Sequence, residues 1–342
     1  MTAETVLADR YRLAHRLGNG GMGDVWLAHD LLLHRTVAIK TVRPAVSEDL
    51  HAERRLRREA RTLASLSHPR LAQVYDFCEK GDCTFIVMEF VDGESLADRL
   101  TREPPPPAEA ARIIAQCASA LDTAHQAGIV HRDVKPSNIM LTGSGGNVKL
   151  IDFGIAATTE PSNTTATVGL IGTVAYLAPE RAAGAQATAA ADVYSLGVVL
   201  YRLLAGRMPF EADESIAMLF AHATAKPPPL PASVPAPLAR ICLDMLAKDP
   251  AARPLSGTVA TALQKASVLK PLSARPAAPA PAPSATSPAS ASAPVRQPDP
   301  AALWRPSPLP TAPAHSARSP RPAVLSAAGL LMIALLSLYY ML

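Results

Sequence analysis

Short motifs of glycine, lysine and acidic or amide residues follow one another in a fixed order between Tyr11 and Arg253. The first is a glycine-rich segment, the second is a lysine that ends an apolar run, and the later ones carry acidic and amide side chains. The chain has 342 residues, of which 49% are hydrophobic, so it can bury a sizeable core as two modest domains or one large two-lobed one.

The segment from Tyr11 to Lys40 predicts two strands joined by a glycine-rich turn, followed by a third strand. It fits the pattern Gly-x-Gly-x-x-Gly-x-Val at Gly18, Gly20, Gly23 and Val25. Without side chains, glycine lets backbone N–H groups approach phosphate oxygens closely. The first half also fits a dinucleotide-binding turn, which should open into a helix. Here Val25 to His29 continues as a strand-like run and Lys40 follows, which favours a nucleotide site of another kind.

A helix-like segment runs from about Asp49 to Leu66 and contains Glu53 and Glu59. Its five arginines predict a mostly solvated face that can also receive a phosphorylated loop: Arg54, Arg55, Arg57, Arg58 and Arg61. Farther along, Phe85 to Val91 predicts a buried strand that runs into a connector, and a helical region opens at Gly93 to Ser95.

A second group of motifs begins after a helical period from Ala108 to Gln126 that ends at Gly128. The motifs in chain order are His131-Arg132-Asp133-Val134-Lys135-Pro136-Ser137-Asn138, then Asp152-Phe153-Gly154, Ala178-Pro179-Glu180, Asp192 in DVYSLG, and Arg253. Their order and spacing resemble the signature set of protein kinases from Tyr11 to about Ala266, and the details resemble the bacterial membrane-bound (Hanks-type) serine/threonine kinases.

This resemblance implies an α+β, two-lobed fold with a β-rich N-lobe (11–90) and a larger helical C-lobe (91–270) around ATP. It implies transfer of the γ-phosphoryl group of ATP to protein serine and threonine hydroxyls. Asp133 would accept the hydroxyl proton, and Lys135 would reach the γ-phosphate. Asn138 and Asp152 would bind Mg²⁺, or Mn²⁺ in its place, since both present oxygen ligands.

The resemblance also implies which residues pair with one another and which contact ATP. Glu59 would pair with Lys40 and hold its ammonium group against the α- and β-phosphates. Met88 would be the gatekeeper residue, and the backbone of Glu89 and Val91 would form hydrogen bonds with the adenine ring of ATP. The remaining ATP-binding candidates are Leu17, Gly18, Asn19, Gly20, Gly21, Met22, Gly23, Asp24, Val25 and Ala38. Structural roles fall to Glu180 paired with Arg253, to Asp192 bracing the catalytic loop, and to Thr173 contacting Asp133 and Lys135.

The stretch from Thr158 to Thr173 has few large apolar residues and predicts an activation loop. Thr165 and Thr167 match the activating threonines of the resembled kinases, so we expect them to be autophosphorylated. Because Arg132 precedes Asp133, it offers a guanidinium group to such a phosphate.

Two other activities agree less well with these motifs. A catalytically dead scaffold would lack at least one of four polar residues, and all are present: Lys40, Asp133, Asn138 and Asp152. Kinases of small molecules, such as antibiotic phosphotransferases, lack Ala-Pro-Glu and the substrate-docking loop, whereas this chain has GTVAYLAPE.

Residues 271–322 hold 15 of the 33 prolines, together with Ala and Ser, which predicts a disordered linker. The basic excess of the chain lies in this linker, so nucleic acid is not an expected partner. Four linker residues are candidates for phosphorylation and for recognition by phosphothreonine-reading modules: Ser284, Thr286, Ser287 and Thr311. The four cysteines, Cys78, Cys83, Cys117 and Cys242, show no metal-ligand spacing and predict reduced thiols.

Residues 323–342 carry no charge and, as a helix, would span about 30 Å, the hydrocarbon thickness of a bilayer. Arg318 and Arg321 precede them and would keep the kinase domain on the cytoplasmic side. A buried C-terminal helix is the alternative, but it would have to dock back across the linker. The N-terminus predicts no signal peptide. We therefore expect a single-pass protein of the cell membrane, with pairing of kinase domains as one route of control.

Overall fold

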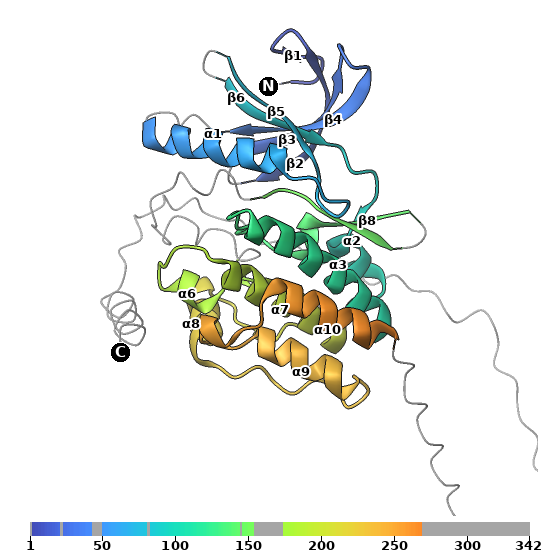
Figure 1. Ribbon diagram of the computed structural model, residues 1–342, viewed down its shortest axis with the longest axis vertical. Coiled ribbons are helices and arrows are strands. Elements are labelled where there is room, and N and C mark those ends of the chain that lie inside the picture. Colours follow the sequence, from blue (N-terminus) through green and yellow to red (C-terminus); the bar gives the residue numbers. More distant parts are fainter. Residues whose placement is uncertain are drawn as a thin grey trace, which may run out of the picture. The chain divides into compact units, whose positions relative to one another are not determined.

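The computed structural model describes residues 2–20, 23–42, 50–80, 83–143, 146–153 and 174–268 (Figure 1). Its N-terminal part is an antiparallel six-stranded sheet in the order β1-β2-β3-β4-β6-β5, with helix α1 (Leu50–Ser65) lying beside it. The strands are β1 (Val6–Leu7), β2 (Tyr11–Gly20), β3 (Gly23–Asp30), β4 (Arg35–Val42), β5 (Val74–Lys80) and β6 (Cys83–Glu89).

Strand β4 lies in the middle of this sheet and is buried on both faces. Side chains alternate between the two faces of a strand. Val37 and Ile39 therefore pack into a small core on one face of the sheet. Ala38, on the other face, belongs to the larger core that continues into the helices. By the same alternation Lys40 lies on the face of Ala38, which is the face turned toward the rest of the molecule.

The hairpin between β2 and β3 depends on glycine at one position in particular. Gly23 has φ +143°, and a Cβ there would lie 1.8 Å from the carbonyl oxygen of Thr41. Glycine is thus required for the close approach of β4 to the hairpin, in addition to any contact with phosphate. At Gly18, by contrast, a Cβ would meet nothing within 4 Å, so the backbone faces open space.

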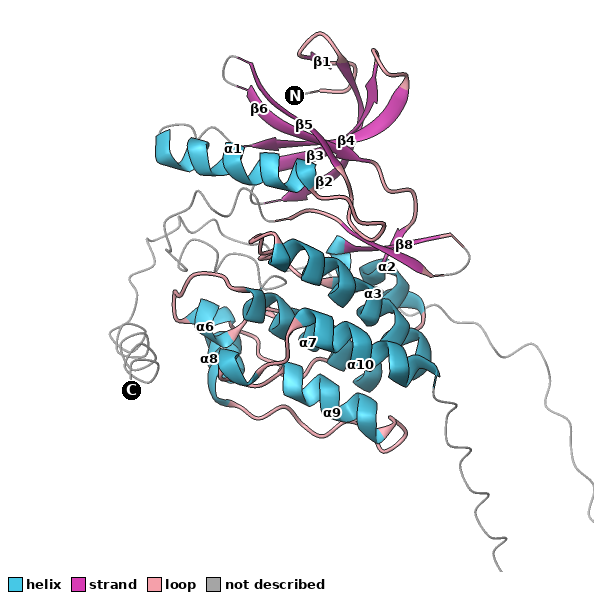
Figure 2. Cartoon of the chain, in the orientation of Figure 1, coloured by secondary structure: helices cyan, strands magenta, loops and turns pink. Residues whose placement is uncertain are grey.

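The C-terminal part is mainly helical (Figure 2). Its helices are α2 (Leu96–Arg102), α3 (Pro107–Gln126), α6 (Pro179–Ala182), α7 (Ala189–Ala205), α8 (Ser215–Thr224), α9 (Ala236–Met245) and α10 (Ser256–Val268), with 3₁₀ turns η2 (Pro136–Asn138) and η4 (Pro250–Ala252). A small antiparallel sheet consists of β7 (Glu94–Ser95), β8 (Ile139–Thr142) and β9 (Asn147–Leu150). The predicted β-rich N-terminal lobe and helical C-terminal lobe are confirmed.

Helices α3 and α7 form the centre of the helical lobe. Most residues of α7 are buried, including Tyr194 and Tyr201, as expected of a helix that is apolar on most of its surface. The helix ends at Gly206, whose φ of +70° is the left-handed conformation that commonly terminates helices.

A buried ion pair joins α6 to the segment after η4. The two terminal nitrogens of Arg253 donate to the two carboxylate oxygens of Glu180 at 2.7 and 2.8 Å. The other three donors of Arg253 bond to the carbonyls of Ala247, Lys248 and Ala190. Every N–H of this fully buried guanidinium group is therefore satisfied, and the expected Glu180–Arg253 pair is present.

Two predicted helices and the predicted hairpin around Cys78 and Cys83 are present in the structure. The predicted helices near 49–66 and 108–126 are α1 and α3, and Cys78 and Cys83 lie on the two strands of a hairpin. Cys78, Cys117 and Cys242 are free thiols. Among the described residues, no helix is long and apolar enough to span a bilayer; the predicted membrane segment 323–342 and the linker 271–322 lie outside them.

Candidate active site

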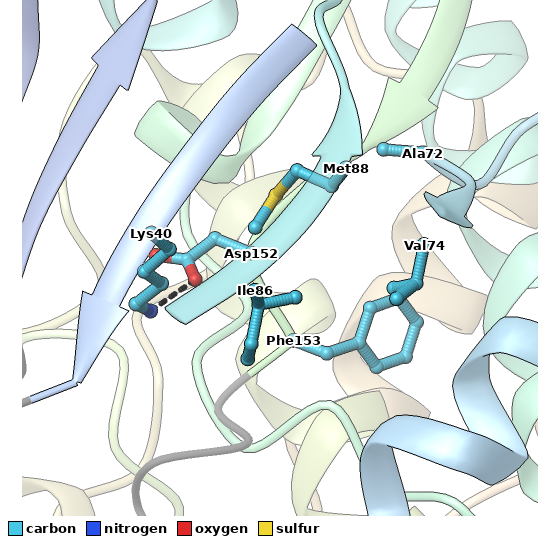
Figure 3. A pocket seen from close by; sticks show the side chains of 7 residues that line it. All are labelled: Lys40, Ala72, Val74, Ile86, Met88, Asp152 and Phe153. Atoms are coloured by element: carbon cyan, nitrogen blue, oxygen red, sulfur yellow. Dashed lines mark hydrogen bonds and ion pairs between the residues drawn. The ribbon is translucent and has the colours of Figure 1, made fainter. Parts of the chain in front are cut away.

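Lys40 and Asp152 form an ion pair between the sheet and the helical lobe. Lys40 comes from β4, and Asp152 comes from the segment that follows β9. Figure 3 shows the two side chains pointing toward each other beside Met88 and Phe153. These four side chains line a small cavity together with Ile86 and Val74. Its volume is about 10 Å³, so the space between the side chains is nearly filled.

Glu59 does not pair with Lys40 in this structure, so the predicted pair is corrected. Its carboxylate accepts two hydrogen bonds from the guanidinium group of Arg132, at 2.8 and 2.9 Å. The planar fork of arginine matches both oxygens of a carboxylate, whereas lysine offers a point charge. Each member of the expected pair thus has a different partner: Asp152 for Lys40, and Arg132 for Glu59.

The loop from His131 to Asn138 is held by Asp192 of α7, which confirms the predicted brace. The carboxylate of Asp192 accepts from the backbone N–H of His131 at 2.7 Å and of Arg132 at 2.9 Å. Arg132 has φ +71°, a conformation that costs a non-glycine residue about 1–3 kcal/mol. Two hydrogen bonds to an ionised acceptor offset this cost.

Asp133 lies at the centre of a polar triad. Its Oδ2 is 2.7 Å from Nζ of Lys135 and accepts from Nδ2 of Asn138 at 3.0 Å. Nδ2 of Asn138 also donates to the carbonyl of Asp133 at 2.8 Å. Asp133 keeps 22% of its side chain exposed, so a substrate hydroxyl can reach it.

The same contacts test whether the site suits a magnesium ion. Because the amide nitrogen of Asn138 is bonded to Asp133, its carbonyl oxygen is the group that can bind a cation. Asp152 adds a carboxylate from the end of β9. Oxygen donors of these types fit Mg²⁺, so the residues present suit the metal.

The expected nucleotide wall lies on β2, β3, β4 and β6. Leu17 and Gly18 come from β2, Gly23 to Val25 from β3, and Ala38 and Met88 from facing positions of β4 and β6. The N–H of Glu89 donates to the carbonyl of Gln73, so only the carbonyl of Glu89 can contact adenine. Gly21 and Met22 lie outside the described residues, as do Thr165, Thr167 and Thr173.

Sequence reasoning missed three contacts around the loop. The ring of Phe153 lies 4.5 Å from that of His131, and His125 of α3 lies 2.8 Å from the carboxylate of Asp192. Burial lowers the pKa of Arg181, and the nearby positive charge of Arg132 lowers it further. Arg181 is thus a second cation whose charge interacts with that of Arg132. Arg181 directly follows the Ala-Pro-Glu motif, which was the one available signal for it.

Known proteins share this architecture. Residues 11–266 match the family model of the protein kinase domain. Serine/threonine-protein kinase PrkC of Bacillus subtilis is 42% identical over 248 residues, which cover 71% of this chain and 38% of PrkC. Serine/threonine-protein kinase PknB of Mycobacterium tuberculosis is 44% identical over 260 residues, which cover 73% of this chain and 41% of PknB. The chain therefore spans about two fifths of the length of these relatives.

A solved structure agrees with the sequence relatives. The crystal structure of the PknI kinase domain of Mycobacterium tuberculosis has a TM-score of 0.59 and 29% identity, over 78% of this chain and 99% of that one. The matched region contains every element that builds the site described above, from β2 to α7. On this evidence the chain belongs to the protein kinase family.

Proposed function

We propose that this chain is a serine/threonine protein kinase that transfers the γ-phosphoryl group of ATP to protein hydroxyls. The observation that supports this most is the triad in which Lys135 and Asn138 each lie within 3.0 Å of Oδ2 of Asp133. ATP supplies the phosphoryl group and Mg²⁺ neutralises its charge. PrkC and PknB are both serine/threonine-protein kinases.

The residues of the chain have separable tasks in this reaction. Asp133 orients the substrate hydroxyl and takes its proton, and Lys135 beside it can donate to the oxygens of the transferred group. Asn138 and Asp152 supply the metal ligands. Phosphoryl transfer needs aligned groups and charge neutralisation more than covalent catalysis, and the triad provides both.

We propose further that the two observed ion pairs belong to a resting state. Asp152 cannot serve a metal ion fully while it neutralises Lys40, and Glu59 cannot support Lys40 while Arg132 holds it. In the active state Glu59 exchanges Arg132 for Lys40. A phosphate on Thr165 or Thr167 favours this exchange by competing for Arg132, with Arg181 as the second cation.

We propose in addition that the chain is attached to a membrane. Residues 323–342 anchor the chain in the cell membrane as a single span, with the kinase domain in the cytoplasm, and 271–322 tether it. Phosphothreonine-reading modules bind the tether, and pairing of kinase domains assists phosphorylation of one loop by another.

The first prediction concerns the reaction itself. With Mg-ATP, the chain should phosphorylate serine and threonine but not tyrosine in a mixed peptide library, and phosphate should appear on Thr165 or Thr167. Asp133→Asn keeps the shape but removes the proton acceptor, so kcat should fall at least about 100-fold. Asp244→Asn, an exposed carboxylate of α9, is the matched control and should keep full activity. Phosphotyrosine as the product, or full activity of Asp133→Asn, would contradict the proposal.

A second prediction separates the resting pair from the active one. Glu59→Gln should lower kcat/KM by about tenfold, because Lys40 loses its support in the active state. Glu79→Gln breaks another carboxylate–arginine pair of α1, with Arg57, and should leave activity unchanged. If Glu59 served only the resting pair with Arg132, its removal would raise activity or leave it constant, and the exchange would be refuted.

The third prediction tests the anchor. Expressed in bacteria, the full chain should sediment with membranes after a carbonate wash, because its uncharged segment is buried in the bilayer. A chain ending at Pro322 should stay in the supernatant with its kinase activity intact. Recovery of both proteins in the supernatant would rule out the membrane span.

A further inference from the structure

The carboxylate of Glu89 joins three segments of the chain at the edge of the nucleotide site. Glu89 is the last residue of β6 and follows Met88, whose side chain lines the cavity beside Lys40 (Figure 3). Its Oε2 accepts from Nζ of Lys149 at 2.7 Å and from the N–H of Gln73 at 3.2 Å. Strand β6, the segment before β5 and strand β9 therefore meet at one oxygen atom.

The position of Lys149 follows from the alternation of side chains along β9. Val148 and Leu150 are fully buried in the larger core, so Lys149 between them lies on the opposite face of the strand. The backbone of Leu150 connects β9 to the segment before β5. Its N–H donates to the carbonyl of Arg70 at 2.8 Å, and its carbonyl accepts from the N–H of Ala72 at 2.9 Å. These two bonds fix β9 and hold Lys149 within reach of the end of β6.

Lys149 and Glu89 form an ion pair that is partly shielded from water. Their side chains are 23% and 24% exposed, so the attraction between them is stronger than for a pair on the open surface. Nζ of Lys149 also donates to the carbonyl of Leu71, at 3.4 Å. Within the parts of the chain that the structure describes, Lys149 is the only cation paired with Glu89. Neutralisation of this carboxylate therefore depends on one lysine.

The backbone of Glu89 is fixed by Gln73. The N–H of Glu89 donates to the carbonyl of Gln73 at 2.8 Å, while the N–H of Gln73 donates to the Glu89 carboxylate. Because its N–H is occupied, the carbonyl is the backbone group of Glu89 that can contact adenine. The 6-amino group of adenine is a hydrogen-bond donor, and a carbonyl is an acceptor that suits it. A 6-keto group, as in guanine, would place a second acceptor there.

We propose that Lys149 is a positioning residue that makes the nucleotide site selective for a purine with an amino group at position 6. Lys149 acts through the carboxylate of Glu89, whose backbone carbonyl receives the amino group; it does not touch the base itself. This role rests on the proposed function, because a kinase of this kind binds ATP.

The physical reason lies in the charge of Glu89. Without Lys149, the Glu89 carboxylate keeps the N–H of Gln73 but loses its cation, and a partly buried carboxylate without a cation is costly. Its side chain then turns toward water. Because the side chain and the carbonyl belong to the same residue at the end of a strand, this turn changes the direction of the carbonyl. The hydrogen bond to the 6-amino group is weakened, whereas contacts to the rest of the nucleotide are kept.

The test compares ATP with purine ribonucleoside triphosphate, which is ATP without the 6-amino group. Their dissociation constants as magnesium complexes are measured with the full chain by isothermal titration calorimetry. The unchanged chain should bind ATP about tenfold more tightly, which corresponds to one hydrogen bond. Lys149→Met should reduce this preference to about threefold or less by weakening the binding of ATP. Binding of purine ribonucleoside triphosphate should change by less than about twofold, because it has no 6-amino group to lose.

Other variants separate the role of the ion pair from general effects on the fold. Lys149→Arg keeps the cation and should keep the preference for ATP. Glu89→Gln removes the charge through which Lys149 acts, so it should lower the preference as Lys149→Met does. The double variant should then be no worse than either single one. Lys265→Met, which changes an exposed lysine of α10, is the matched control and should preserve the preference.

Equal weakening of both nucleotides in Lys149→Met, or an unchanged preference, would overturn the proposal, because a merely structural ion pair does not distinguish bases that differ by one amino group. If Lys149→Met has a lowered melting temperature, Glu89→Gln decides the question by the same two measurements. Failure of the unchanged chain to bind either nucleotide would refute the ATP site and this role with it. A preference that survives the loss of Lys149 refutes this role alone. The measurements need no phosphoryl transfer.

Discussion

The carboxylate of Asp192 is the constraint on which the catalytic loop depends. It is buried on α7, the central helix of the lobe, and holds two consecutive backbone N–H groups. These two hydrogen bonds hold Arg132 in a left-handed conformation. In that conformation the side chain of Arg132 pairs with Glu59, while Asp133 pairs with Lys135. The packing of α7 in the core therefore fixes the position of Asp192, and Asp192 in turn positions the polar side chains of the catalytic loop.

The resting arrangement follows from a competition among four charged groups. Lys40 and Arg132 are the cations, and Glu59 and Asp152 are the anions. In the proposed exchange Glu59 leaves Arg132 and pairs with Lys40, so the pairing depends on where α1 and the segment after β9 are positioned. Nucleotide phosphates, a metal ion or a phosphorylated loop would each add charge to this set and change the preferred pairing.

Much of the fold and site could be predicted because the motifs are local. Short contiguous motifs identify the glycine turn, the lysine of β4 and the loop from His131 to Asn138. Apolar periodicity predicts helices α1 and α3. The partner of Glu59 could not be predicted, since an ion pair between distant elements depends on tertiary position.

A crystal structure of the full chain with Mg²⁺ and a non-hydrolysable ATP analogue would show whether the ion pairs of Lys40 and Glu59 exchange on nucleotide binding. Such a structure should place Nζ of Lys40 within about 4 Å of the Glu59 carboxylate, as expected for an ion pair, and Asp152 on the metal. Nucleotide and metal in the site, with Lys40 still paired to Asp152 and Glu59 still paired to Arg132, would contradict the exchange.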